Sequence, residues 1–298
     1  MAEMVSHPRH ASRRLDWMPL LALPAIVFAA EDRLPPWAFM WGLAFAIYAG
    51  FKWLSWRRSR LEIEHPRWRS AAYLLAWPGM DAKSFLNPES RVDSPRGAAW
   101  MGAAFVTALG AALLWIGARA VPACQPLFRG WTGMLGFVLL AHFGVFKLLA
   151  LLWQTLGVNA VPIMSAPLKS ASLSEFWGKR WNLGFRQLAY DFVLTPVRKK
   201  LGVGAAGFLV FVASGLIHDF VISLPAGGGF GLPTFYFTLQ GLGIAVERSV
   251  AGRRLGLGHG IGGWLFTALV AAGPVLCLFH PPFVLRVILP FMKAVHAL

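Results

Sequence analysis

Charged residues are scarce in this chain: Asp, Glu, Lys and Arg together make up 14% of its 298 residues. Soluble domains carry about a quarter, so an ordinary soluble domain is excluded. Apolar residues make up 57%, the mean hydropathy is +0.57, and the apolar residues fall in long runs. A run of about 20 apolar residues crosses a hydrocarbon core, where each backbone polar group must be paired within the segment. The sequence therefore predicts an all-α, polytopic transmembrane helical bundle forming one domain over residues 1–298.

Motifs for metal, cofactor or nucleophile chemistry are also lacking. The two cysteines, Cys124 and Cys277, lie far apart and match no metal spacing, although one disulfide remains compatible with the sequence. A Gly-x-Gly-x-x-Gly pattern at Gly202, Gly204 and Gly207 follows no strand and runs into a hydrophobic segment, so we interpret it as a flexible entry to the membrane rather than a dinucleotide site. We expect no metal and no bound cofactor, and an enzyme built on this chain has to use a histidine.

Hydrophobic runs predict about eight spanning helices. A further stretch at 71–80 is too short to cross and is expected at the interface or as a re-entrant segment. The first run can alternatively be a signal peptide, since Val27 and Ala29 loosely suit a cleavage site. The predicted crossings are 17–30, 36–54, 97–118, 131–154, 204–224, 232–246, 262–280 and 282–298.

A formal charge of +15 suits nucleic acid in principle, but the placement of the charge argues against that partner. With the N-terminus in the cytoplasm, most Lys and Arg fall in inside loops, as the positive-inside rule expects. The exceptions are Arg33, Arg119 and Arg129 outside, with Lys147 and Arg286 inside segments. This asymmetry predicts that both termini are cytoplasmic. We expect a multi-pass protein of a bacterial inner membrane.

Two polar residues stand together in the fifth segment, His218 and Asp219. Counted from Gly204, His218 lies roughly 21 Å along the helix at about 1.5 Å per residue, at a depth where polar groups are costly and often functional. A neutral imidazole there can accept a proton from an alcohol, and Ser214, one turn earlier on the same face, can orient the ring. Asp219 points about 100° away and is expected to pair elsewhere. The alternative is a structural histidine bonded to a neighbouring helix.

Other polar residues in or near the spanning segments are ambiguous. Glu247 ends the sixth segment, where structural anchoring and function are equally compatible with an interfacial acid. His142 and Lys147 in the fourth segment either line the same cavity or snorkel.

A second cluster, SLSEFWGKRWNLGFRQLAY at 172–190, is amphipathic, aromatic and basic. It predicts a helix lying in the membrane interface, capped by Ser172 or Ser174, with Glu175 as the partner of Ser172 in a capping box. Its cations suit either the phosphates of a nucleotide carrier or anionic lipid heads. These cations are Lys179, Arg180 and Arg186, followed by Arg198, Lys199 and Lys200.

The order of these clusters resembles the wax-synthase-like branch of the membrane-bound O-acyltransferase superfamily. The resemblance is carried by SEFWGKRWN at 174–182, SGLIHD at 214–219 and a hydrophobic segment ending in Glu247. LLAWPGMD at 74–81 resembles an element of bacterial members. The similar core covers about residues 70–250.

The resemblance implies transfer of an acyl group from a thioester, usually acyl-CoA as co-substrate, to a hydroxyl of a lipid-like alcohol. The family's signature Asn and His correspond to Asn182 and His218, which implies a general base at His218 and a role for Asn182 on the donor side. We expect substrate contacts from Trp177, Lys179, Arg180, Trp181, Ser214 and Asp219.

Two readings compete with the enzyme. In a transporter, His218 and Asp219 form an intramembrane proton or substrate site, and in a structural membrane subunit the polar residues only join helices. The expected partners are acyl-CoA, a hydroxyl-bearing lipid and membrane lipids, without nucleic acid. The sequence leaves open the acceptor alcohol, the acyl length and the oligomeric state.

Overall fold

A computed structural model describes residues 16–90 and 92–298, and within those ranges every regular element is a helix. The all-α prediction is thereby confirmed for the described residues. Arg9, Arg13, Arg14 and Arg91, which contribute to the predicted inside charge, lie outside them. The α-helices are α2 (Met18–Phe28), α3 (Pro36–Ser59), α4 (Arg67–Ala76), α5 (Ala82–Leu86), α6 (Gly97–Ala112), α7 (Ala118–Ala120), α8 (Pro126–Val138), α9 (Phe146–Thr155), α10 (Leu173–Glu175), α11 (Leu183–Ala189), α12 (Thr195–His218), α13 (Leu224–Ala226), α14 (Leu232–Arg248), α15 (Val250–Arg254), α16 (Gly260–Ala272), α17 (Val275–Leu278), α18 (Pro281–Phe283) and α19 (Leu289–Ala294).

Wider π-helical turns interrupt several long helices without ending them. They lie at η2 (Leu113–Gly117), η3 (Leu139–Val145), η5 (Phe176–Arg180), η6 (Tyr190–Leu194), η7 (Asp219–Ser223) and η8 (Val284–Ile288). Such turns are rare and concentrate at functional sites. Two of the six coincide with stretches that carry the family resemblance: η5 lies within 174–182, and η7 begins at Asp219, the last residue of 214–219.

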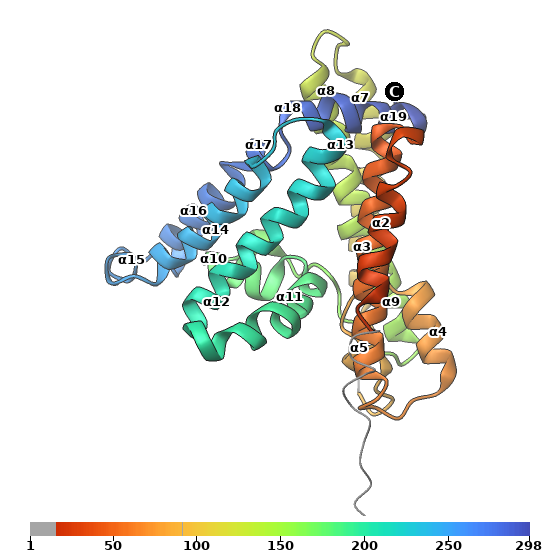
Figure 1. Ribbon diagram of the computed structural model, residues 1–298, viewed down its shortest axis with the longest axis vertical. Coiled ribbons are helices and arrows are strands. Elements are labelled where there is room, and N and C mark those ends of the chain that lie inside the picture. The colour runs from red at the N-terminus through yellow and green to blue at the C-terminus, as the bar shows by residue number, and fades with distance from the viewer. Residues whose placement is uncertain (1–15, 91) are drawn as a thin grey trace, which may run out of the picture.

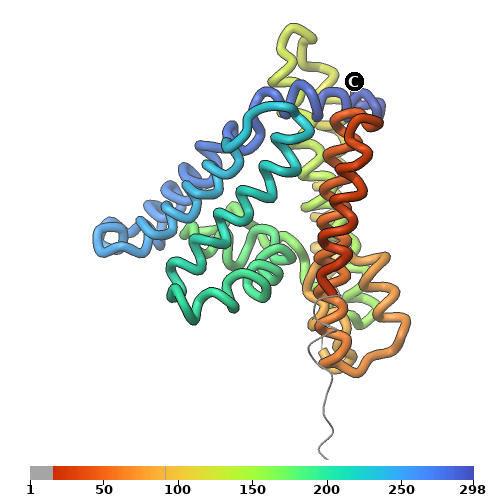
Figure 2. Tube along the Cα trace, in the orientation of Figure 1, coloured from red at the N-terminus to blue at the C-terminus, as the bar shows by residue number. Residues whose placement is uncertain are grey.

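The helices form two groups that diverge from a common upper end (Figure 1). One group stands upright and contains the α2–α3 pair together with the helices from α6 to α9 (Figure 2). The other is inclined and contains the antiparallel pair α12 and α14 with α16 beside them. The short helices α10 and α11 lie between the two groups towards the lower side.

Close backbone approach holds the upright group together. An added Cβ on Gly110 of α6 would lie 2.3 Å from the backbone nitrogen of Leu140, and one on Gly136 of α8 would lie 2.6 Å from that of Leu114. No larger residue fits at either position without separating the helices. Small residues at helix crossings are the usual means of close packing in a bilayer.

Four helices are long and apolar enough to cross a membrane by length and composition: Gly97–Ala120, Pro126–Thr155, Leu183–Ala226 and Gly260–Leu278. They correspond to the third, fourth, fifth and seventh predicted crossings. Of the remaining four, α2 has 11 residues and α14 has 17, while α3 has 24 but carries Lys52, Arg57 and Arg58 towards its end. Eight crossings are therefore more than length and composition support.

The last predicted crossing, 282–298, is corrected by the structure. The stretch from α18 to α19 lies across the upper ends of the other helices instead of running alongside them (Figure 1). Its helical residues, 281–294, extend only about 21 Å at 1.5 Å per residue, less than the roughly 30 Å of a hydrocarbon core. Arg286 donates to the carbonyls of Ala226 and Gly227 and so fastens the stretch to that end.

This correction also removes the support for placing both termini on one side. The chain ends at the upper end of the molecule, whereas α2 begins at the lower end (Figure 1).

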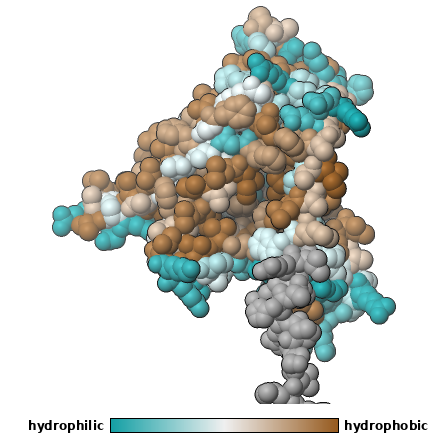
Figure 3. Space-filling model, in the orientation of Figure 1, coloured by the Kyte–Doolittle hydropathy of each residue, from teal (hydrophilic) through white to brown (hydrophobic). Residues whose placement is uncertain are grey.

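Apolar side chains form a band across the middle of the visible face, with polar ones gathered above it and at the lower left and lower right (Figure 3). The protein is a multi-pass integral membrane protein.

Candidate active site

A cavity of about 730 Å³ opens between the α12–α14 pair and the segment from α10 to η6. Its wall is mainly aromatic and aliphatic, with a few polar side chains. Such a pocket, apolar with few convergent polar groups, is the usual form of a small-molecule site. The polar lining residues are Ser174, Asn182, Arg186, Tyr190, Ser214, His218 and Arg248.

One face of α12 forms the longest wall of the cavity. Gly204, Gly207, Phe211, Ser214 and His218 all line it, and their spacing of three or four residues places them on one helical stripe. From the first to the last of them the helix rises roughly 21 Å at about 1.5 Å per residue. The cavity therefore extends from the start of the membrane helix to the histidine.

The antiparallel partner α14 approaches α12 closely beside the histidine. A Cβ added to Gly215 would lie 2.6 Å from the Cα of Thr234, so only glycine permits this crossing. The approach brings Phe237 against His218, with ring centroids 4.4 Å apart. Trp177 packs against the same Phe237, at 5.8 Å.

The imidazole of His218 is held in one tautomer. Its Nδ1 lies 2.7 Å from the carbonyl oxygen of Ser214, and a carbonyl oxygen only accepts, so Nδ1 carries the hydrogen and donates it. In the neutral ring Nε2 is left with the lone pair. The predicted orienting role of Ser214 thus falls to its backbone carbonyl. A ring fixed in this way has the form that a general base requires.

Asn182 ends the stretch that carries SEFWGKRWN and begins α11. Its backbone is left-handed, with φ 43°, and its side-chain oxygen accepts the amide hydrogen of Phe185 as the N-cap of α11. Asparagine suits both demands. Because Oδ1 is occupied by the cap, the two hydrogens on Nδ2 are the donors that Asn182 can offer to a bound molecule.

The predicted interfacial helix over 172–190 is not continuous. The chain is helical from Leu173 to Arg180, extended at Trp181, left-handed at Asn182 and helical again from Leu183. Left-handed backbone interrupts an α-helix. This break places Trp177, Trp181 and Asn182 in the wall of one cavity.

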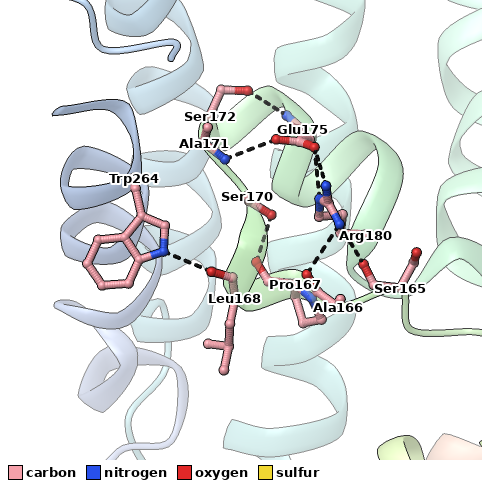
Figure 4. Close-up of polar contacts among 10 residues, drawn as sticks. All are labelled: Ser165, Ala166, Pro167, Leu168, Ser170, Ala171, Ser172, Glu175, Arg180 and Trp264. Atoms are coloured by element: carbon pink, nitrogen blue, oxygen red, sulfur yellow. Dashed lines mark hydrogen bonds and ion pairs between the residues drawn. The ribbon is translucent and has the colours of Figure 1, made fainter. Parts of the chain in front are cut away.

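Polar contacts hold the start of this stretch in place (Figure 4). Ser172 is the N-cap, since its hydroxyl accepts the amide hydrogen of Glu175 at 3.0 Å, as one of the two predicted caps. The Glu175 carboxylate accepts from the amide of Ala171 and from the guanidinium of Arg180, and these contacts lower the pKa of Glu175. Arg180 also donates to the carbonyls of Ser165 and Ala166.

Glu247, at the end of α14, anchors the same stretch from the other side. Its carboxylate is 5% exposed and accepts the amide hydrogen of Leu173 at 2.5 Å, with longer contacts to that of Ser174. Arg248 donates to the Ser174 hydroxyl. A carboxylate at the first amides of a helix satisfies donors that have no partner within the helix, so Glu247 here has an anchoring contact.

Three of the predicted substrate-binding residues do not line the cavity. The carboxylate of Asp219 accepts from the amides of Gly231 and Thr234 and from the hydroxyls of Ser223 and Thr234, so it pairs elsewhere, as the helix geometry predicted. Lys179 is exposed, and Arg180 is held by Glu175. His142 and Lys147 are likewise outside the cavity lining. Trp177, Trp181, Asn182, Ser214 and His218 are brought together.

The structure also adds Gly204, Gly207 and Arg248, which sequence reasoning did not select for the site, and it places the predicted cation Arg186 in the same lining. Gly204 and Gly207 line the cavity, and a Cβ added to either would meet no atom within 4 Å. Arg186 and Arg248 line it near the start of α12, and among the residues the structure describes neither forms an ion pair. Gly204 and Gly207 stand three residues apart on the same helical stripe as His218. This spacing is visible in the sequence and could have identified the two glycines as lining residues.

Comparison with known proteins finds a family match and several distant relatives. Residues 160–239 match the membrane bound O-acyl transferase family. The long-chain-alcohol O-fatty-acyltransferase of Simmondsia chinensis is 31% identical over 38% of this chain and 39% of its own length. Two Arabidopsis thaliana proteins, probable long-chain-alcohol O-fatty-acyltransferases 3 and 8, are 31% and 33% identical over 42% and 34% of this chain and 44% and 33% of theirs.

The matched segment contains Asn182, His218 and most of the cavity wall. Over residues 160–239 the chain matches the membrane bound O-acyl transferase family, and it is distantly homologous to long-chain-alcohol O-fatty-acyltransferases. The chain aligns with about two fifths of the length of the first two of these relatives.

Proposed function

We propose that this protein, as a single acyltransferase domain, transfers an acyl group from acyl-CoA to the hydroxyl of a long-chain, lipid-like alcohol. The observation that carries the proposal is the shared cavity: Asn182 and His218, from two separate family motifs, line one apolar hollow. The relatives supply the reaction type by their names. An apolar cavity suits two reactants with aliphatic chains.

The chemistry follows from the atoms that the two residues offer. His218 Nε2 accepts the proton of the alcohol as its oxygen attacks the thioester carbonyl. Asn182 Nδ2 donates to the carbonyl oxygen, where negative charge develops. The carbon–sulfur bond then breaks, an ester bond remains, and the thiolate of CoA recovers the proton from His218.

The donor's path is argued from length and charge. An extended chain advances about 1.2 Å per bond, since three bonds of extended backbone span about 3.6 Å. The pantetheine arm of CoA therefore reaches roughly 16 Å, close to the rise of α12 between Gly207 and His218 at 1.5 Å per residue. With the thioester at His218, the phosphates fall near Arg186 and Arg248, whose guanidinium groups suit phosphate.

A direct assay tests the reaction. Purified protein in detergent or nanodiscs, given a fatty acyl-CoA and a long-chain alcohol, is expected to release free CoA and to form the ester in equal amounts. Thiol release and mass spectrometry of the lipid product measure the two yields. Thiol release without ester would indicate a thioesterase, and neither product with any alcohol of this class would reject the proposal.

The transporter reading finds no support in the site. It relied on Asp219 beside His218, but the oxygens of Asp219 already accept from α14 and Ser223. A carboxylate engaged in this way is stabilised as a helix cap. No second function is proposed.

The two glycines of α12 that line the cavity, Gly204 and Gly207, lead to a prediction for donor binding. Gly207→Leu is expected to raise KM for acyl-CoA about tenfold or more, because the new side chain enters space that the donor arm needs, and overpacking by a few methylenes costs about 1–3 kcal/mol. The apparent KM for the alcohol should stay within about twofold, because a change in ground-state binding of one substrate leaves the other unaffected. Steady-state kinetics with each substrate varied measures both.

Gly102→Leu on α6 is the matched control. Its Cβ also meets no atom within 4 Å, but Gly102 is exposed and outside the cavity, so both KM values should be unchanged. A shift of Gly207→Leu towards shorter alcohols, with an unchanged KM for acyl-CoA, would instead assign this wall to the acceptor chain.

A further inference from the structure

A buried lysine in α3 lies outside the site described so far. Lys52 is 2% exposed, and its ammonium forms none of the ion pairs found among the described residues. Nζ donates to the carbonyl of Trp77 at 2.7 Å and to that of Gly79, and it lies 3.5 Å from the centre of the Tyr73 ring. A buried polar group is costly unless it is hydrogen-bonded, and the two carbonyls supply the acceptors for the Lys52 amino group.

Both carbonyls belong to the WPGMD loop, residues 77–81, between α4 and α5. The hydroxyl of Tyr48, also in α3, donates to the same Trp77 carbonyl at 3.3 Å. Within the loop the Trp77 indole covers Gly79, where a Cβ would lie 2.4 Å from the indole nitrogen. The conformation of this loop is therefore fixed from the side of α3, chiefly by Lys52.

The far side of the loop rests on the first turn of α11. A Cβ on Gly184 would lie 3.3 Å from the backbone nitrogen of Met80 and 3.5 Å from its Cβ. A small hollow of about 50 Å³ separates residues 79–81 from residues 183–187. Gly184 is buried and stands two residues after Asn182, the N-cap of α11. Lys52, the WPGMD loop and the turn that bears Asn182 are thus joined by direct contacts.

We propose that Lys52 is a positioning residue for Asn182: by holding the WPGMD loop it fixes the first turn of α11, and so the direction of the Asn182 amide in the cavity. This inference rests on the proposed role of Asn182 in acyl transfer. A lysine is suited to the task because one amino group carries several N–H donors and two backbone carbonyls of one loop converge on it. Without Lys52 these carbonyls would be buried acceptors with one donor fewer.

The test is a double-mutant cycle on the full-length protein. Lys52→Met keeps the apolar stem and removes the ammonium, and it is expected to lower kcat about 10- to 100-fold, as small misplacements of catalytic groups do. In an Asn182→Asp background the same change should lower kcat by less than about threefold, because the group that Lys52 positions is already lost. Lys147, a half-buried lysine on α9, lines neither the cavity nor the small hollow beside the loop, so Lys147→Met should keep the wild-type kcat.

A second variant covers the case in which Lys52→Met does not fold. Gly184→Ala leaves the lysine and its carbonyls in place but puts a Cβ 3.3 Å from the backbone nitrogen of Met80 and so displaces the first turn of α11 from the loop. It should show the same loss of kcat and the same lack of effect in the Asn182→Asp background. Equal losses in both backgrounds, or wild-type kcat in both single variants, would overturn the proposal. An inactive wild-type protein would reject the acyltransferase function instead, so the two failures are distinguishable.

Discussion

His218→Asn is expected to lower kcat for acyl transfer by about 10²–10⁴-fold, the usual contribution of general acid–base catalysis. The asparagine amide can still donate to the Ser214 carbonyl, the contact that His218 Nδ1 makes at 2.7 Å, but it places no proton acceptor at the position of Nε2. Turnover of purified protein with acyl-CoA and a long-chain alcohol measures the loss. Thermal unfolding should be nearly unchanged, because the internal hydrogen bond is retained.

The comparison with His218→Gln and His218→Ala separates catalysis from structure. Neither Gln nor Ala accepts a proton at neutral pH, so a catalytic histidine leaves all three variants similarly inactive. A structural histidine instead predicts graded losses, with Ala the least stable because the hydrogen bond and the packing against Phe237 are both removed. Substantial turnover by His218→Asn or His218→Gln would remove the general base from the mechanism.

Asn182→Asp is expected to lower kcat by about 10²–10³-fold, the effect of losing one donor to a developing oxyanion. Aspartate keeps the two structural functions of this position, since its carboxylate can accept the Phe185 amide hydrogen and it tolerates a left-handed backbone. It lacks the Nδ2 hydrogens and adds a negative charge where the oxyanion forms. The measurement is kcat at saturating acyl-CoA, with helix content and thermal unfolding as controls for folding.

Asn182→Gly is a second control: it removes the amide donors without adding a charge. Glycine accepts the φ of 43° without strain and loses only a few tenths of a kcal/mol as a cap, so this variant should fold and should also be impaired. Asn182→Ala is less informative, because it loses the cap and strains the backbone by about 1–2 kcal/mol. Near-normal activity of Asn182→Asp would show that the amide donates nothing to the reaction.

Much of the site was predictable because the local sequence sets it. His218 stands out as a polar residue deep in an apolar run, and its helical spacing from Ser214 predicted the contact that orients the ring. The same geometry predicted that Asp219 pairs elsewhere, and it accepts from Gly231 and Thr234. These predictions depend only on helical periodicity, which the sequence displays directly.

Other parts were not predictable because they depend on contacts between distant segments. The left-handed turn at Asn182 breaks what the sequence pattern presents as one amphipathic helix. Arg180 was expected to bind substrate, but it forms an ion pair with Glu175, and Arg248 from α14 lines the cavity in its vicinity. A sequence shows which residues are basic, but it does not show which acceptors their side chains contact in the folded protein.

The sequence by itself indicated a membrane-embedded protein, because 57% of its residues are apolar and 14% charged. It favoured helices because its apolar residues fall in runs of about 20, the length of a spanning helix. The depth of a polar residue in an apolar run identified His218, and the family resemblance identified Asn182. Only the tertiary structure decided that 282–298 lies across the bundle, because hydropathy measures the preference for an apolar environment and carries no direction. Likewise only the packed helices show that Gly204 and Gly207 of α12 line a cavity and that Lys52 reaches the loop that packs on the first turn of α11, since these contacts join residues far apart in the chain.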